Sequence, residues 1–124
     1  MILKLKHHFD ASHKLYNKNW SAKKNKQIYG ACNNLHGHRW GVEIKIDGDT
    51  NVNGWIVNFK DLKKIINKFD HQYVNDVINV IPTAENIALI LLDEIRNLGK
   101  FNMVEVTVYE TPDCSITVNS LRGD

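Results

Sequence analysis

The chain has 124 residues, 43% of them hydrophobic and 24% charged, which is typical of one soluble globular domain spanning residues 1–124. Its net charge of +2 is too small to indicate nucleic-acid binding, and no apolar run approaches the roughly 20 residues that a membrane-spanning helix needs. Because the N-terminus also lacks the apolar stretch of a signal peptide, we expect a cytoplasmic protein whose Cys32 and Cys114 are reduced thiols.

Alternating apolar and polar side chains over residues 2–13 predict a half-buried strand, with His13 at its end on the apolar face. We interpret His7 and His8 as surface or edge residues of this strand. Residues 14–34 are polar with little periodicity, and we expect a long loop there, which can include a helical turn. Its lysines form either a solvated surface or a cover that attracts an anionic substrate; they are Lys18, Lys23, Lys24 and Lys26.

Hydrophobic periodicity defines the elements that follow this loop. It predicts strands over residues 36–46, 55–59, 103–110 and 116–118, and helices over residues 60–69 and 83–98. Thr83 can cap the second helix, and Gly99 ends it. The order β, loop, β, β, α, α, β, β predicts an α+β domain with an antiparallel sheet and both helices packed on one face.

A His-x-His pair opens the strand over residues 36–46. Alternation places His36 and His38 on one face, roughly 6.5–7 Å apart at ~3.3 Å per residue. Two imidazoles so spaced can bind one ion at Zn–N distances of about 2.0–2.1 Å, and His13 from a neighbouring strand can supply a third. A His-x-His pair alone is common, but three imidazoles with one open position are what a catalytic zinc site needs.

Cys32 lies four residues before His36 and is the candidate nucleophile or base of this sequence. The alternative is a small buried side chain. The polar neighbours Asn33 and Asn34 are not typical of a core and favour the catalytic interpretation. Cys114 follows a turn signal without comparable neighbours, and we interpret it as structural.

Acidic residues in the second half of the chain have open interpretations. Asp70-His71 follows the first helix and is either a helix-terminal polar pair or an acid that orients an imidazole for proton transfer. Glu110 continues the apolar face of its strand, so its carboxylate needs either a salt bridge or a ligand with paired N–H groups. Glu85 lies in the first turn of the second helix, where the helix dipole alone accounts for it.

A series of motifs covers nearly the whole chain: Phe9-Asp10-Ala11-Ser12-His13, Cys32-Asn33-Asn34-Leu35-His36-Gly37-His38, Gly54-Trp55-Ile56-Val57-Asn58-Phe59, Phe69-Asp70-His71-Gln72-Tyr73-Val74-Asn75-Asp76, Pro82-Thr83-Ala84-Glu85-Asn86 and Tyr109-Glu110-Thr111. Together they resemble the 6-pyruvoyltetrahydropterin synthase superfamily. The spacer between Cys32 and His36 has three residues, and this length resembles that in bacterial 6-carboxy-5,6,7,8-tetrahydropterin synthases of queuosine biosynthesis. Asn58 departs from the family pattern, which usually has Asp there, and the loop between His13 and Cys32 is longer than in the bacterial carboxy enzymes.

The resemblance implies the T-fold, in which an antiparallel four-stranded sheet with two helices on one face assembles into an oligomeric barrel. The homo-oligomer would be trimer-based, with six subunits. The resemblance also implies roles for site residues: Zn²⁺ on His13, His36 and His38; Cys32 as the base; Asp70 and His71 as relay partners contributed across a subunit interface; and Glu110 anchoring the pterin ring, with Thr83 and Glu85 nearby.

The activity that the resemblance implies is conversion of 7,8-dihydroneopterin triphosphate to 6-carboxy-5,6,7,8-tetrahydropterin, with release of acetaldehyde and triphosphate. The partner is then a small pterin substrate, with no nucleic acid or membrane. One alternative is the pyruvoyl reaction on the same substrate, without loss of carbon. Two others are a non-catalytic domain whose structural zinc takes Cys32 as a fourth ligand, and a zinc hydrolase that does not depend on Cys32.

Overall fold

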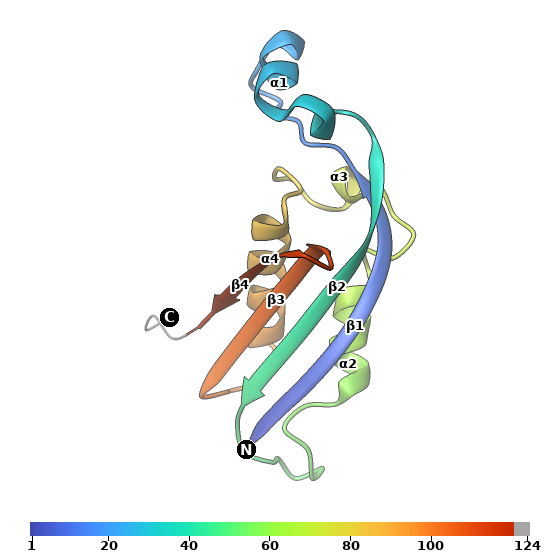
Figure 1. Cartoon of the computed structure of the whole chain (residues 1–124). Coiled ribbons are helices and arrows are strands. Elements are labelled where there is room, and N and C mark those ends of the chain that lie inside the picture. Colours follow the sequence, from blue (N-terminus) through green and yellow to red (C-terminus); the bar gives the residue numbers. More distant parts are fainter. Residues whose placement is uncertain (121–124) are drawn as a thin grey trace.

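The computed structural model describes residues 1–120 and contains one four-stranded sheet in the order β1-β2-β3-β4, with every neighbouring pair antiparallel. The strands are β1 (Ile2–His13), β2 (His36–Asp47), β3 (Met103–Thr111) and β4 (Cys114–Asn119), and they follow one another across the curved sheet in Figure 1. The predicted α+β class with an antiparallel sheet is therefore confirmed.

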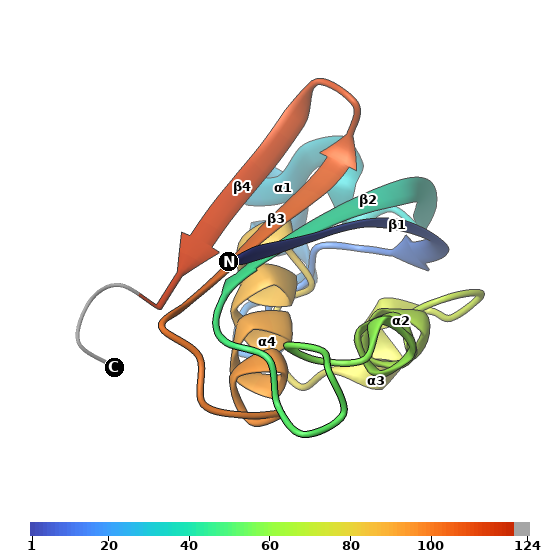
Figure 2. The ribbon, with the colours of Figure 1, turned by 90° about the horizontal axis from the view of Figure 1, so that it is seen from below.

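Two helices cover one face of this sheet, as Figure 2 shows. The helices and the 3-10 turn are α1 (Ala22–Tyr29), η1 (Gly30–Asn33), α2 (Phe59–Asn67), α3 (Val74–Val77) and α4 (Ala84–Arg96). Of these, α2 and α4 pack under the strands and correspond to the two predicted helices. Among the described residues, no helix has the length and apolar character needed to cross a membrane.

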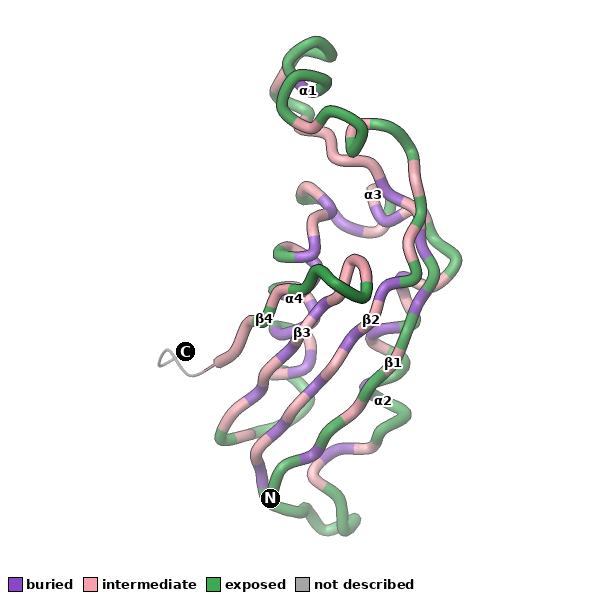
Figure 3. Tube along the Cα trace, in the orientation of Figure 1, coloured by how far each residue is buried: buried purple, intermediate pink, exposed green. Residues whose placement is uncertain are grey.

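The core lies between the sheet and these two helices, and its side chains follow the predicted alternation. Figure 3 shows buried and more exposed positions alternating along β2 and β3. The largest side chains without exposed surface include Trp40 on β2 and Phe69 after α2, and the ring of Phe9 on β1 stacks on Trp40 at 5.7 Å. Burial of such rings stabilises the fold mainly through the hydrophobic effect.

The predicted strand over residues 55–59 is wrong. The backbone there forms local turns instead, because Asn51 donates its N–H to the Trp55 carbonyl at 3.0 Å and accepts from Gly54 N–H at 2.9 Å. Asn58 then caps α2, since its side chain accepts from the N–H of Lys60 at 2.9 Å. Asn and Asp cap helices equally well, so the departure from the family pattern at Asn58 preserves this function.

The expected loop over residues 14–34 is only partly a loop, because it contains α1 and η1. Ser21 caps α1, because its hydroxyl accepts from Lys24 N–H at 3.1 Å. The fully buried Asn25 amide donates to the carbonyls of Asn17 and Ser21 at 3.0 and 3.1 Å. Polar amides therefore hold this helix, which explains why no apolar periodicity announced it. In Figure 1, α1 projects away from the sheet.

Candidate metal centre

Three histidines meet where β1 ends and β2 begins. The antiparallel register pairs His13 with His36 directly and places His38 opposite Ala11. His13 and His38 therefore reach the same face from neighbouring strands, and His36 joins them because it is two residues from His38. The ring centroid of His13 lies 4.5 Å from that of His36 and 5.2 Å from that of His38.

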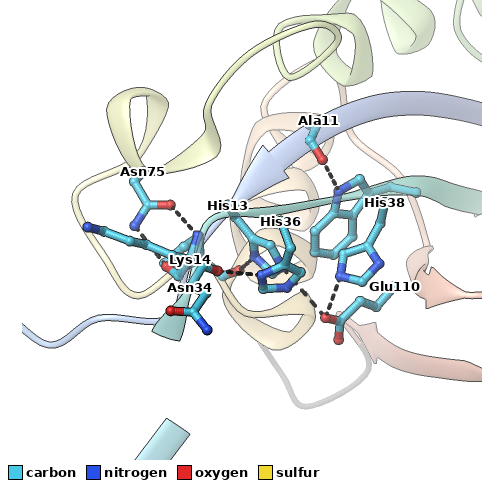
Figure 4. Close-up of polar contacts among 10 residues, drawn as sticks. Ala11, His13, Lys14, Asn34, His36, His38, Asn75 and Glu110 are labelled. Carbon is cyan, nitrogen blue, oxygen red and sulfur yellow. Dashed lines mark hydrogen bonds and ion pairs between the residues drawn. The ribbon is translucent and has the colours of Figure 1, made fainter. Parts of the chain in front are cut away.

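Backbone carbonyls orient two of these imidazoles. His13 donates from Nδ1 to the Pro82 carbonyl at 2.8 Å, and His36 donates from Nδ1 to the Asn34 carbonyl at 2.7 Å (Figure 4). A carbonyl can only accept, so this arrangement leaves both Nε2 atoms with a free lone pair. Metal-binding histidines are commonly oriented by such a partner on the other ring nitrogen.

The inner ring nitrogens are buried without a hydrogen bond. Nε2 of His13 and Nε2 of His38 have no such partner, although buried polar atoms in folded proteins almost always have one. Burial lowers the pKa of His13, an effect that the Pro82 carbonyl opposes and the neighbouring His36 reinforces. A neutral imidazole is the form that binds a metal, so the lowered pKa of His13 and the buried, unbonded Nε2 atoms fit a metal ion.

Glu110 approaches the histidines from the end of β3. Its carboxylate lies 3.1 Å from Nε2 of His38 and 3.6 Å from Nε2 of His13, and Figure 4 shows it below both rings. Together with His36, these residues offer ligand atoms that all lie within 4.8 Å of one another. The carboxylate on the apolar face therefore finds its partners at the metal centre.

Cys32 lies outside this group. It is an exposed free thiol on η1, and the group of potential metal ligands among residues 1–120 does not include it. Its backbone carbonyl accepts from Leu15 N–H at 2.7 Å, which ties η1 to the segment that follows β1. Cys114, at the start of β4, is exposed as well.

Asp70 and His71 form a hydrogen-bonded pair at the outer edge of β1. Nδ1 of His71 donates to the Asp70 carboxylate at 2.8 Å, and the other carboxylate oxygen accepts from Asp10 N–H at 2.9 Å. The Asp10 N–H and then His71 lower the pKa of Asp70, while the hydrogen bond to Asp70 raises the pKa of His71. The side chain of His71 is 80% exposed, so the pair presents an imidazole to solvent.

A shallow, open groove of about 500 Å³ lies beside His71. Residues 10–12, 37–39 and 71–73 line it, and they include His38 of the histidine group. Thr83 lies apart from it as the N-cap of α4, where its hydroxyl accepts from Asn86 N–H at 3.2 Å. Glu85 is exposed in the first turn of α4.

Sequence patterns did not identify the groups that orient the histidines. The carbonyls of Pro82 and Asn34 are backbone atoms, and every residue has one. The indole of Trp40 packs edge-on against His13 at 4.9 Å and donates to the Ala11 carbonyl at 3.3 Å. Only its position two residues after His38 could have indicated this contact, because alternation puts both on one face.

Known proteins provide a comparison for this arrangement. Residues 2–120 match the family described as 6-pyruvoyl tetrahydropterin synthase. A protein of Archaeoglobus fulgidus, provisionally named 6-carboxy-5,6,7,8-tetrahydropterin synthase, is 42% identical over 86 residues, which cover 66% of this chain and 73% of that protein. The 6-pyruvoyl tetrahydrobiopterin synthase of Dictyostelium discoideum is 34% identical over 121 residues, covering 90% of each chain.

The fold has a close structural match as well. The structure of Caenorhabditis elegans 6-pyruvoyl tetrahydropterin synthase superimposes with a TM-score of 0.79 at 24% identity, over 97% of this chain and 95% of that one. The similarity therefore covers the sheet, the helices that pack on it and the strand ends that carry the histidines.

Proposed function

The chain belongs to the 6-pyruvoyl tetrahydropterin synthase family, and on that premise we propose that this lyase converts 7,8-dihydroneopterin triphosphate to 6-carboxy-5,6,7,8-tetrahydropterin. Acetaldehyde and triphosphate are the other products. The observation that carries the proposal is the group of three histidines. Nε2 of His13 and of His38 is buried without a hydrogen bond, and backbone carbonyls accept from Nδ1 of His13 and of His36, which leaves Nε2 of both rings free. The 42% identity to the Archaeoglobus fulgidus protein and the three-residue spacer after Cys32 favour the carboxy product.

The metal of this proposal is Zn²⁺, held by His13, His36 and His38. Three imidazole nitrogens suit zinc, and a catalytic zinc site keeps a position open for substrate. When bound, the ion would supply Lewis acidity to the hydroxyl groups of the substrate side chain. Glu110 lies beside the histidines at 3.1 Å from His38, so its carboxylate can hold the paired N–H groups of the pterin ring next to the metal.

Proton transfer is assigned to Cys32 and His71. The thiol of Cys32 is exposed on η1 and is free to act as a base. Asp70 fixes the tautomer of His71 by accepting from its Nδ1, so that Nε2 faces outward and can take or give a proton. Thr83 and Glu85, at the start of α4, lie near the pterin site in this proposal.

The active site is completed between subunits of a trimer-based homohexamer in this proposal. Within residues 1–120 no strand pairs with the outer edge of β4, and unpaired edges favour pairing with another chain. The single chain also keeps Cys32 on the projecting η1 segment, apart from the metal-ligand group. Subunit contact would bring thiol, imidazole and metal together.

Product analysis tests the activity. Purified protein loaded with Zn²⁺ is incubated with 7,8-dihydroneopterin triphosphate, and the pterin product and acetaldehyde are measured by mass spectrometry. We expect stoichiometric acetaldehyde and the carboxypterin. A diketo side chain without loss of carbon would show the pyruvoyl reaction instead, which is the second candidate because the Dictyostelium relative carries that name.

Two variants separate the metal from the thiol. His36→Ala removes a ligand and is expected to abolish stoichiometric zinc together with turnover. Cys32→Ala is expected to retain zinc and lose turnover, with Cys114→Ala, the other exposed thiol, as the matched control. Loss of zinc in Cys32→Ala would instead support a structural site with a sulfur ligand, and full turnover without Cys32 would show that Cys32 is not the base.

A further inference from the structure

The end of β1 is held on both of its edges. On the inner edge, His13 pairs with His36 of β2. On the outer edge, Ser12 forms a parallel bridge with Tyr73 and donates its N–H to the Gln72 carbonyl at 3.1 Å. A parallel ladder would next use the backbone of the following residues to bind Lys14.

The chain cannot continue that ladder, because α3 begins at Val74. The side chain of Asn75 takes the place of the missing backbone. Its Oδ1 accepts from Lys14 N–H at 3.0 Å, and its Nδ2 donates to the Lys14 carbonyl at 2.9 Å (Figure 4). A carboxamide carries the same donor and acceptor as a peptide group, so it can complete the pairing on both sides of one residue.

These bonds enclose the most buried histidine of the metal centre. His13 lies between Ser12 and Lys14, both of which are bound to the segment that contains Asn75. Its side chain is 1% exposed and is held at Nδ1 by Pro82. A movement of the strand end would therefore shift the His13 ring relative to the Pro82 carbonyl and to the other two imidazoles.

We propose that Asn75 is a positioning residue of the metal centre, which fixes the end of β1 so that Nε2 of His13 points at the ion. The proposal rests on the metal site of the proposed function and does not depend on the reaction catalysed there. Groups that orient metal ligands typically change metal affinity by about 10–100-fold when they are removed. Asn75 acts through the backbone of the next residue, so we expect the lower end of that range.

The experiment measures the Zn²⁺ affinity of the metal-free full chain by competition with a chromophoric chelator. Asn75→Ala is expected to bind Zn²⁺ about tenfold more weakly than the natural chain. The visible spectrum of Co²⁺ in the same site is the second readout, and we expect Asn75→Ala to change its band positions, because the ligand geometry changes. Loss of fold stability alone would leave that spectrum unaltered in the folded fraction.

Asn67→Ala is the matched control. Asn67 also ties β1 to a following segment, through a hydrogen bond of 2.8 Å to Nε2 of His7, but it does so six residues before His13. We expect this variant to keep the affinity and the spectrum. Equal affinities for Asn75→Ala and Asn67→Ala would overturn the proposal.

A second variant covers the case in which Asn75→Ala does not fold. Asn75→Asp keeps an acceptor for Lys14 N–H but loses the donor to its carbonyl, and it should also weaken binding relative to Asn67→Ala. Unaltered binding in Asn75→Asp would then overturn the proposal. A natural chain that binds Zn²⁺ but converts no pterin would refute the proposed activity while leaving the role of Asn75 intact, whereas a chain that binds no metal refutes both.

Discussion

His71 has a backbone φ of 58°, which is unusual for a residue other than glycine. Adjacent residues rarely form a side-chain pair, and this conformation explains how Asp70 and His71 do so at 2.8 Å. The backbone N–H of His71 donates to the Asp10 carbonyl at 2.7 Å, which holds the turn against β1. Such a backbone costs free energy and often marks a functional position.

The pH dependence of this pair is predictable in sign. The pKa of His71 is raised above 6.5, so its contribution to stability is complete below pH 6.5 and is lost as the pH rises through the higher value. The pKa of Asp70 is lowered below 3.8, so its contribution is complete above pH 3.8 and is lost as the pH falls through the lower value. The hydrogen-bonded ion pair is therefore strongest between these two values.

Histidine NMR titration measures this effect directly. We expect the His71 ring to titrate above 6.5 in the natural chain, and Asp70→Asn to move its pKa back toward 6.5 because the charged acceptor is gone. Asp93→Asn, an exposed acid on α4, is the control and should leave the His71 titration in place. An identical His71 pKa in Asp70→Asn and the natural chain would contradict the pairing.

At the scale of elements, the start of α4 combines two functions. The Pro82 carbonyl orients His13, and the next residue, Thr83, caps the helix by accepting from Asn86 N–H. The amide of Asn86 donates in turn to the Ile81 carbonyl at 2.8 Å. One turn of chain therefore fixes both the helix end and the carbonyl that orients His13.

Thr83→Ala tests the capping function. Loss of an N-cap hydroxyl costs about 0.5–2 kcal/mol, and we expect a decrease of about 1 kcal/mol in the free energy of unfolding measured with urea. Thr83→Ser keeps the hydroxyl and should stay close to the natural chain. If Thr83→Ser were destabilised as much as Thr83→Ala, the methyl group and not the cap would be responsible.

The projecting helix α1 is the element that periodicity described least well. Its lysines are exposed, and Lys24 lies 4.5 Å from the centre of the Trp20 ring. A solvated surface accounts for their exposure, while the attraction of an anionic substrate stays a prediction. Ile28 on α1 and Leu35 after η1 are 58% and 66% exposed, so these apolar residues are not packed within one chain.

At the scale of the whole molecule, the open sheet edge and the exposed apolar residues of the projecting α1–η1 segment both favour assembly. A closed barrel removes the strand edges that otherwise invite uncontrolled pairing. We expect light scattering to give a mass that is a multiple of three times the 14.3 kDa chain, and six chains for the trimer-based hexamer. A mass of 14.3 kDa at micromolar concentration would refute assembly and, with it, a site shared between subunits.

Much of the fold could be predicted from local patterns. Alternation in β1 and β2 depends only on the two-residue period of a strand, so it correctly placed His13 beside the core and His36 and His38 on one face. The apolar period of α4 and the capping position of Thr83 were equally local. The prediction of a strand over residues 55–59 was wrong because the chain bends there before α2, while Val57 still reaches the core.

The sequence by itself indicated the candidate site residues and which face of each strand they occupy, because both follow from residue type and backbone period. The tertiary structure decided what those side chains meet. It placed His13 opposite His36, brought Glu110 within 3.1 Å of His38, and supplied the Pro82 carbonyl from 69 residues away. Backbone carbonyls and an amide such as Asn75 have no distinguishing pattern, and only the packing of distant segments gives them partners.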